Sequence, residues 1–253
     1  MFITPTLKPV LRIVVILFVL YLVIVAIVYL RQRSMLFFPT HATPHTGLSS
    51  WSDGARTIGY CREVTNARAI WLMLHGNAGQ AADRDYALQC MSRQDSLYVL
   101  EYPGYGLREG SPSRKSMNQA AAEAYRLLRA RNPHNPVCVL GESIGSGPAC
   151  ALAQENPAPD KIVLVVPFDS LANVASRRFF FLPARLLLHD AWDNVASLRH
   201  YTGPVEIFAA RDDEIIPISH AKALAQQIPT AKLISISGGH NDWSESDSVK
   251  IEP

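Results

Sequence analysis

The sequence predicts an α/β fold: a mainly parallel sheet with helices on both faces, preceded by one N-terminal transmembrane helix. The first observation is that short apolar runs alternate with longer helical stretches along the chain. Parallel strands need crossover connections, and the helices that supply them cover both faces of the sheet. The second observation is an unbroken apolar run near the N-terminus. The third is a glycine-containing motif directly after one of the expected strands.

The apolar run extends from Ile13 to Leu30 and contains only apolar residues and tyrosines. With about 18 residues it would be roughly 27 Å long as a helix, which nearly spans a bilayer. We expect residues 1–34 to be an uncleaved membrane anchor with its flanks, and residues 35–253 to form one catalytic domain. A cleaved signal peptide is the competing interpretation. However, the run is long for a signal peptide, and residues 29–33 contain no small-residue cleavage site.

Basic residues flank the apolar run on both sides. Lys8 and Arg12 precede it, and Arg31 and Arg33 follow it. The positive-inside rule depends on an imbalance of these charges, so it favours neither orientation. We therefore expect a single-pass membrane protein, and the side of the membrane that the domain faces stays open.

The expected sheet begins after a connecting segment that contains Pro39, Pro44 and Gly47. Each expected strand is a short apolar run, whereas the expected helices are longer and several are rich in alanine and leucine. The expected strands are 57–60, 69–74, 97–101, 137–140, 162–166, 205–209 and 233–236. The expected helices are 81–93, 117–131, one that follows residue 145, and 218–227.

The glycine-containing motif is Gly-Glu-Ser-Ile-Gly at residues 141–145, directly after the expected strand 137–140. It fits the pattern G-x-S-x-G, in which a serine is held on a strained turn between a strand and a helix. A serine hydroxyl is a weak nucleophile, so it has to be accessible and needs a base beside it. The motif alone recurs by chance, but the strand before it and the small residues after it favour Ser143 as a nucleophile.

Two later loops carry the partners that a serine nucleophile needs. Asp213 and His240 each lie on a loop that follows an expected strand. A histidine near its unperturbed pKa of about 6.5 accepts the serine proton at neutral pH, and a carboxylate fixes its tautomer. Asp212 is a second candidate for the acid, because only one of two adjacent side chains faces the histidine. Asp169 is a third, with capping of the next helix as its competing interpretation.

Residues 75–79, His-Gly-Asn-Ala-Gly, follow the buried-looking strand 69–74. A tetrahedral intermediate carries an oxyanion, which needs backbone N–H donors that a tight loop can aim. We expect the N–H groups of Asn77 and Ile144 to form this oxyanion hole. We interpret His75 as a buried histidine that shapes the loop rather than as the base.

Five motifs in one order resemble the α/β-hydrolase fold, and within it the membrane-anchored Bem46-type serine hydrolases. The resemblance covers about residues 35 to 245. The matching motifs lie at 75–79, 102–106 with 110–113 beyond it, 141–145, 213–217 and 239–242.

The resemblance implies a role for each site residue. Ser143, Asp213 and His240 would form a catalytic triad, with Asp213 preferred over Asp212 because the family places the acid directly before the Glu-Ile-Ile-Pro segment. Ser146 stands where many relatives have glycine, but this position lies beyond the nucleophile. The expected reaction is hydrolysis of an ester or thioester through an acyl-enzyme. The alternatives are a serine peptidase and a catalytically silent binding or scaffold protein on the same fold.

An unusually apolar stretch, residues 177–188, lies between the expected strand 162–166 and the acid loop. We expect it to belong to a small cap around 171–200 that walls an acyl pocket or touches lipid, with its arginines facing phosphates. The alternative is a helix that packs on the core through Leu186 and Leu187. Both interpretations can hold together.

Composition narrows the expected partners. A net charge of +2 over 253 residues, with no dense basic stretch among aromatics, gives no support to nucleic-acid binding. No metal-ligand or nucleotide motif is present, so we expect neither a metal nor an organic cofactor. Cys138 in a strand and Cys150 in a helix favour buried thiols over disulfides. The expected partners are a small-molecule or lipid-like acyl substrate and the lipid bilayer.

Overall fold

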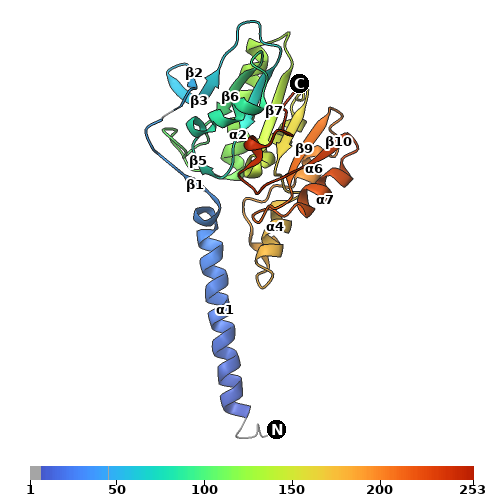
Figure 1. The fold of residues 1–253 in the computed structure, drawn as a ribbon. Helices are drawn as coiled ribbons and strands as arrows, with labels where there is room; N and C mark the ends of the chain where they lie inside the picture. Colours follow the sequence, from blue (N-terminus) through green and yellow to red (C-terminus); the bar gives the residue numbers. More distant parts are fainter. Residues whose placement is uncertain (1–6, 45) are drawn as a thin grey trace.

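The computed structural model describes residues 7–44 and 46–253. Residues 1–6 of the expected anchor segment 1–34, together with residue 45, lie outside the described residues. One long helix, α1 (Leu7–Leu36), extends away from a domain that is built around a twisted sheet (Figure 1).

The sheet has eight strands in the order β10-β9-β8-β7-β4-β6-β3-β2. Their bounds are β2 (Ser49–Asp53), β3 (Arg56–Arg62), β4 (Ile70–Leu74), β6 (Ser96–Leu100), β7 (Val137–Glu142), β8 (Ile162–Val165), β9 (Val205–Ala210) and β10 (Ala231–Ile236). From β10 to β6 all neighbours are parallel, whereas β3 runs antiparallel to both β2 and β6. The chain passes from β4 to β6 on one side and then to β7 on the other. Ligands of open α/β sheets bind at such a reversal of strand order.

The central strand β4 shows why these segments form strands. All five of its residues are buried, and successive side chains point to opposite faces of the sheet. Ile70, Leu72 and Leu74 join the hydrophobic core on one face, while Trp71 and Met73 join the core on the other. A strand that is covered on both faces reads as a continuous apolar run rather than an alternating one.

Different elements cover the two faces. The core on one face includes residues from α2 (Arg114–Arg131), α3 (Ser146–Ala151), α6 (Asn194–Leu198) and α7 (Ser219–Gln227). The other core is closed by the 3₁₀ helix η1 (Ala81–Cys90) and by the C-terminal segment with η4 (Trp243–Glu245). Two short 3₁₀ helices, η2 (Ser143–Gly145) and η3 (Leu152–Gln154), flank α3. The expected cap region 171–200 carries α4 (Leu171–Arg178) and α5 (Ala184–Leu187) before α6.

Two local expectations differ from the structure. The segment expected as a helix over 81–93 is a 3₁₀ helix that ends at Cys90. Asp83 binds the backbone N–H of Gln80, and such local side-chain bonds compete with regular helical hydrogen bonding. The connecting segment also forms a two-residue strand, β1 (Phe38–Pro39), parallel to β5 (Ala78–Gly79).

Helix α1 is longer than the predicted apolar run. Within the described part of the chain it is the helix with the length and composition to cross a membrane, with a mean hydropathy of 3.4 over its apolar window. At about 1.5 Å per residue its 30 residues extend roughly 45 Å. Phe37, the residue after α1, is buried in the core of the domain and packs edge-on against Trp192.

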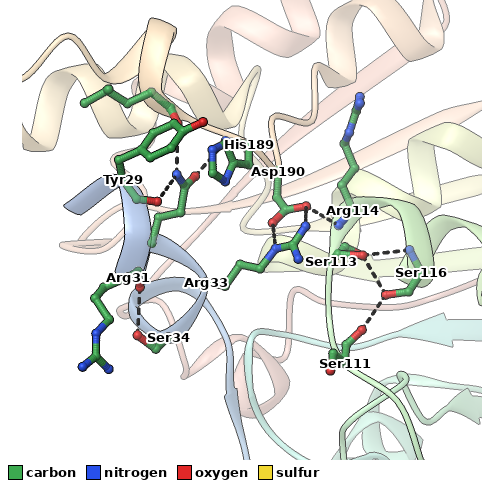
Figure 2. A network of polar contacts seen from close by, with 12 residues as sticks. Tyr29, Arg31, Arg33, Ser34, Ser111, Ser113, Arg114, Ser116, His189 and Asp190 are labelled. Atoms are coloured by element: carbon green, nitrogen blue, oxygen red, sulfur yellow. Dashed lines mark hydrogen bonds and ion pairs between the residues drawn. The ribbon is translucent and has the colours of Figure 1, made fainter. Parts of the chain in front are cut away.

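Polar contacts fix the end of α1 to the domain (Figure 2). Arg33 Nε donates to Asp190 Oδ2 at 2.8 Å, and the backbone N–H of Arg114 donates to Asp190 Oδ1 at 2.8 Å. Gln32 Nε2 donates to the Leu187 carbonyl at 3.0 Å. The helix end is therefore held between the cap region and the start of α2.

Candidate active site

Ser143 lies on a sharp turn at the end of β7. Its φ of +52° is in the left-handed region, which is a strained conformation for a residue other than glycine. The turn also requires Gly145, because a Cβ there would collide with the carbonyl oxygen of Leu74 on the neighbouring strand. The strand, the strained turn and the following helix together present the Ser143 hydroxyl at the edge of the sheet.

Ser143, His240 and Asp213 are joined by a chain of hydrogen bonds. His240 Nε2 lies 2.9 Å from Ser143 Oγ, and His240 Nδ1 lies 2.7 Å from Asp213 Oδ2. With the Nδ1 proton donated to the carboxylate, Nε2 is left to accept the serine proton. The other carboxylate oxygen, Oδ1, accepts from the N–H groups of Ile215 at 2.9 Å and Ile216 at 2.7 Å. These bonds fix the carboxylate toward His240.

The other two candidate acids lie elsewhere. Asp212 is exposed, and its side chain makes no hydrogen bond within the described residues. Asp169 Oδ1 contacts His220 Nδ1 at 2.7 Å, and its Oδ2 accepts from Asn173. Ser170, not Asp169, caps α4, so the expected capping role of Asp169 is wrong. Burial alone would raise the pKa of Asp169, but the bonds from His220 and Asn173 lower it overall.

Asn77 and Ile144 line the same cavity as Ser143. Neither backbone N–H has an acceptor among the hydrogen bonds of the described chain, so both are available to a ligand. The loop is held from the outside, because the Asn77 carbonyl accepts from Phe38 N–H at 2.9 Å and from the Tyr105 hydroxyl at 2.8 Å. Such fixed, unpaired donors suit a developing negative charge.

His75 is fully buried beside this loop. Its Nδ1 lies 2.8 Å from the Gly76 carbonyl oxygen, and its ring packs against Tyr102 with centroids 4.4 Å apart. The Tyr102 hydroxyl donates to the His75 carbonyl at 3.0 Å. These contacts agree with a histidine that shapes the loop.

Glu142 is a site residue that the sequence analysis missed. Its carboxylate accepts from Gly76 N–H at 3.0 Å, from the Tyr86 hydroxyl at 2.7 Å and from Trp243 Nε1 at 2.9 Å. Burial alone would raise its pKa, but the charge of Arg84 and these three hydrogen bonds lower the pKa below its usual value. In the sequence, only its position directly before Ser143 indicated a place in the site.

Arg84 is a second residue that the sequence did not reveal. Its guanidinium donates to the Ala78 carbonyl and to the Tyr86 hydroxyl, and it lines the cavity that holds Ser143. Burial opposes its charge, yet the nearby Glu142 carboxylate raises its pKa overall. A fixed cation therefore lies beside the loop 75–79.

The cavity at Ser143 has a volume of about 440 Å³, which is within the range of small-molecule sites. The cap contributes to its wall through Leu171 and Val174 of α4. Leu187 of α5 lines an adjoining cavity. Leu186, by contrast, is 86% exposed, so the interpretation that it packs on the core is wrong.

Metal-ligand geometry is absent from the described residues, where no three His, Cys, Asp or Glu side chains gather around one point. The cysteines Cys61, Cys90, Cys138 and Cys150 are buried free thiols. The groups that the site offers are its serine, histidine and carboxylate side chains and its backbone donors.

Solved structures share this arrangement of sheet and helices. The esterase Pf2001 of Pyrococcus furiosus superimposes with a TM-score of 0.61 at 11% sequence identity, over 83% of this chain and 94% of that chain. The chain has the α/β-hydrolase fold. The predicted fold class, a mainly parallel sheet with an N-terminal apolar helix, is confirmed.

Sequence relatives also match over most of the chain. An uncharacterized protein of Mycobacterium tuberculosis is 29% identical over 237 residues, which cover 87% of this chain and 84% of the relative. The lysophosphatidylserine lipase ABHD12 of Mus musculus is 27% identical over 204 residues, which cover 71% of this chain and 51% of that lipase. No family model matches this chain, and the resemblance to the Bem46-type subfamily stays a prediction.

Proposed function

We propose that this α/β-hydrolase is a membrane-anchored serine hydrolase that cleaves an ester or thioester. The observation that carries the proposal is the chain of hydrogen bonds from Ser143 through His240 to Asp213, with distances of 2.9 and 2.7 Å. Its structural relatives include an esterase and its sequence relatives include a lipase, which supports an ester as the substrate.

In the proposed reaction, His240 Nε2 takes the proton of Ser143 as Oγ attacks the carbonyl carbon. The N–H groups of Asn77 and Ile144 hold the oxyanion of the tetrahedral intermediate, and loss of one such donor typically costs about 2.7 to 4 kcal/mol of transition-state stabilisation. The intermediate collapses when the leaving group takes the proton from His240, which leaves an acyl-enzyme. Water activated by His240 then releases the acid, while Asp213 stabilises each imidazolium that forms.

The lining of the site supports an acyl substrate over a peptide. Phe168, Leu171, Val174 and Ile216 form apolar walls beside Ser143, and apolar walls match a hydrocarbon chain. A peptide would leave its backbone N–H and C=O groups without partners along such walls, at a cost in free energy for each group. The serine peptidase therefore stays the weaker alternative.

Helix α1 supports the proposed single-pass attachment to a membrane. Its span Pro9–Leu36 is apolar and exposed, and an exposed helix of this composition would be insoluble on a free protein. The proposed domain division places the anchor in residues 1–34 and the catalytic domain in residues 35–253.

Activity-based labelling with a fluorophosphonate tests the proposal, because this reagent bonds covalently to an activated serine. We expect wild-type protein to be labelled and Ser143→Ala protein to remain unlabelled. A series of nitrophenyl esters of increasing chain length then tests hydrolysis directly. A folded wild-type protein without labelling would favour the silent binding protein, and turnover of peptides alone would favour the peptidase.

A further inference from the structure

Two neighbouring cavities have part of their lining in common. The cavity of about 440 Å³ contains Ser143 and His240, and a second cavity of about 330 Å³ lies between α1 and the cap. They have four apolar residues in common, which are Leu36, Leu171, Val174 and Ile215. The space at the nucleophile therefore shares apolar wall residues with a space beside the anchor helix.

One face of α1 is turned toward the cap. Tyr21, Val25, Val28, Gln32 and Leu36 are less exposed than their neighbours on the helix. Their spacings of three or four residues place them on one side of the helix. Val28, Gln32 and Leu36 line the second cavity directly. The anchor helix thus forms one wall of that cavity, and α4 and α5 form the opposite wall.

The cap reaches down along the apolar part of α1. The Tyr21 hydroxyl donates to the Phe181 carbonyl at 3.1 Å, and Tyr21 lies roughly 22 Å below Leu36 along the helix axis. At the tip of the cap, Phe180 is 86% exposed, Phe181 54% and Leu186 86%. A bilayer with a hydrocarbon core of about 30 Å around α1 therefore also surrounds this tip. Exposed aromatic and leucine side chains are favoured there.

Exposed arginines lie on the cap and near the end of α1. Arg178 lines the second cavity, and Arg31, Arg178 and Arg185 are all exposed. Exposed cations of this kind match the phosphates of lipid headgroups. The second cavity thus has a cation, Arg178, among lining residues that are mainly apolar.

We propose that the second cavity holds the acyl chain of a lipid ester drawn directly from the bilayer, so that the anchor helix is itself part of the substrate-binding site. This proposal rests on the proposed serine hydrolase function. The acyl chain would pass between α1 and the cap and then between the shared wall residues Leu36 and Ile215, which would bring its carbonyl to Ser143. The combined space suits a single chain. On this route the chain stays in apolar surroundings, whereas extraction through water would cost free energy for every methylene group.

The test compares two alanines of α4. Ala175 lines the second cavity, and Ala172 lines a separate polar cavity on the same helix. Full-length protein in dialkyl-ether phosphatidylcholine vesicles, which offer no competing ester, is assayed with nitrophenyl butyrate and nitrophenyl palmitate. We expect Ala175→Phe to lower the ratio of palmitate to butyrate kcat/KM by roughly tenfold or more, because the ring displaces several methylene groups. Ala172→Phe should keep the wild-type ratio.

A second pair of variants tests the anchor wall. Val28 lines the cavity, whereas Val23 is exposed on the lipid-facing side of α1. Val28→Phe should lower the same ratio, and Val23→Phe should not. Wild-type ratios in both Ala175→Phe and Val28→Phe would overturn the proposal, because the cavity would then hold something other than the acyl chain. Failure of the hydrolase function itself is distinguishable, since it would abolish butyrate hydrolysis and fluorophosphonate labelling in wild-type protein.

Discussion

Glu142 accepts a hydrogen bond from Trp243 Nε1 at 2.9 Å, and this contact joins the residue before Ser143 to the segment after His240. The same carboxylate accepts from Gly76 N–H at 3.0 Å, in the loop that presents Asn77. One buried charge therefore connects three loops that are far apart in sequence. Their relative positions depend on its ionised form.

The first prediction concerns acid stability. The pKa of Glu142 is lower in the folded state than its usual value. Its contribution to stability is thus present above the unfolded pKa and is lost as the pH falls through the folded pKa. We expect Glu142→Gln to cost about 1.5 to 3 kcal/mol of unfolding free energy at pH 7, as hydrogen bonds to a charged group do. The difference from wild type should shrink at acid pH.

Urea unfolding between pH 7 and pH 3 measures this difference. The exposed Glu109 provides a matched control, because Glu109→Gln should parallel wild type at every pH. If the difference in unfolding free energy between Glu142→Gln and wild type stayed constant down to pH 3, the assigned direction of the pKa shift would be contradicted.

The second prediction tests the nucleophile and the base together. Ser143→Ala and His240→Ala should each reduce kcat by several orders of magnitude, up to about 10⁶-fold as in a serine protease. The double variant should be scarcely worse than either single variant, because the two residues act as one unit. Steady-state hydrolysis of a short nitrophenyl ester provides the measurement. If the fold reductions in kcat of the two single variants multiplied in the double variant, the two residues would act independently.

The third prediction distinguishes the adjacent carboxylates. Asp213→Asn should lower kcat on the order of 10⁴-fold, because an amide no longer holds the histidine in the required tautomer. Asp212→Asn should have a much smaller effect, since the Asp212 side chain is exposed to solvent. Both variants should melt cooperatively, which separates a catalytic loss from unfolding. An inactive Asp212→Asn beside an active Asp213→Asn would reverse the assignment.

The fourth prediction concerns the anchor. The full chain should stay with membranes through a carbonate wash, and a chain that begins at Ser34 should be released yet still hydrolyse a short soluble ester. The shorter chain keeps the buried Phe37 but loses Gln32 and Arg33, which contact the cap. Because Arg33 is half exposed, we expect the loss to cost about 1 kcal/mol, or roughly 2–4 °C in Tm.

A chain that begins at Arg31 keeps both contacts and serves as the matched control. It should melt above the chain that begins at Ser34. Full-length protein in the carbonate supernatant would exclude the anchor, and an insoluble chain from Ser34 would show that the domain boundary is misplaced.

The sequence predicted those features that depend on local patterns. Buried strands such as β4 are continuous apolar runs, and Ser143, Asp213 and His240 each follow such a run, so their common edge of the sheet could be deduced. Their geometry agrees with the expected roles, which remain predictions until the variants are measured.

Features that depend on contacts between distant residues could not be predicted in the same way. Glu142 is one residue in a motif whose second position is variable, and only the fold brings Gly76 and Trp243 to it. The pair of Asp169 and His220 is separated along the chain by α4, α5, α6 and β9. The packing of the α1 face beginning at Tyr21 against the cap leaves no periodic signal, because residues 13–30 are apolar or tyrosine on every side of the helix.

The contact between Arg33 and Asp190 also has a kinetic consequence. In a protein anchored as proposed, it would hold the mouth of the site at a fixed height over the bilayer, so that the enzyme would meet a lipid substrate in two dimensions. Turnover should then follow the mole fraction of substrate within the membrane rather than its bulk molarity. Addition of inert lipid at constant total substrate should slow the reaction by surface dilution, and addition of buffer should not.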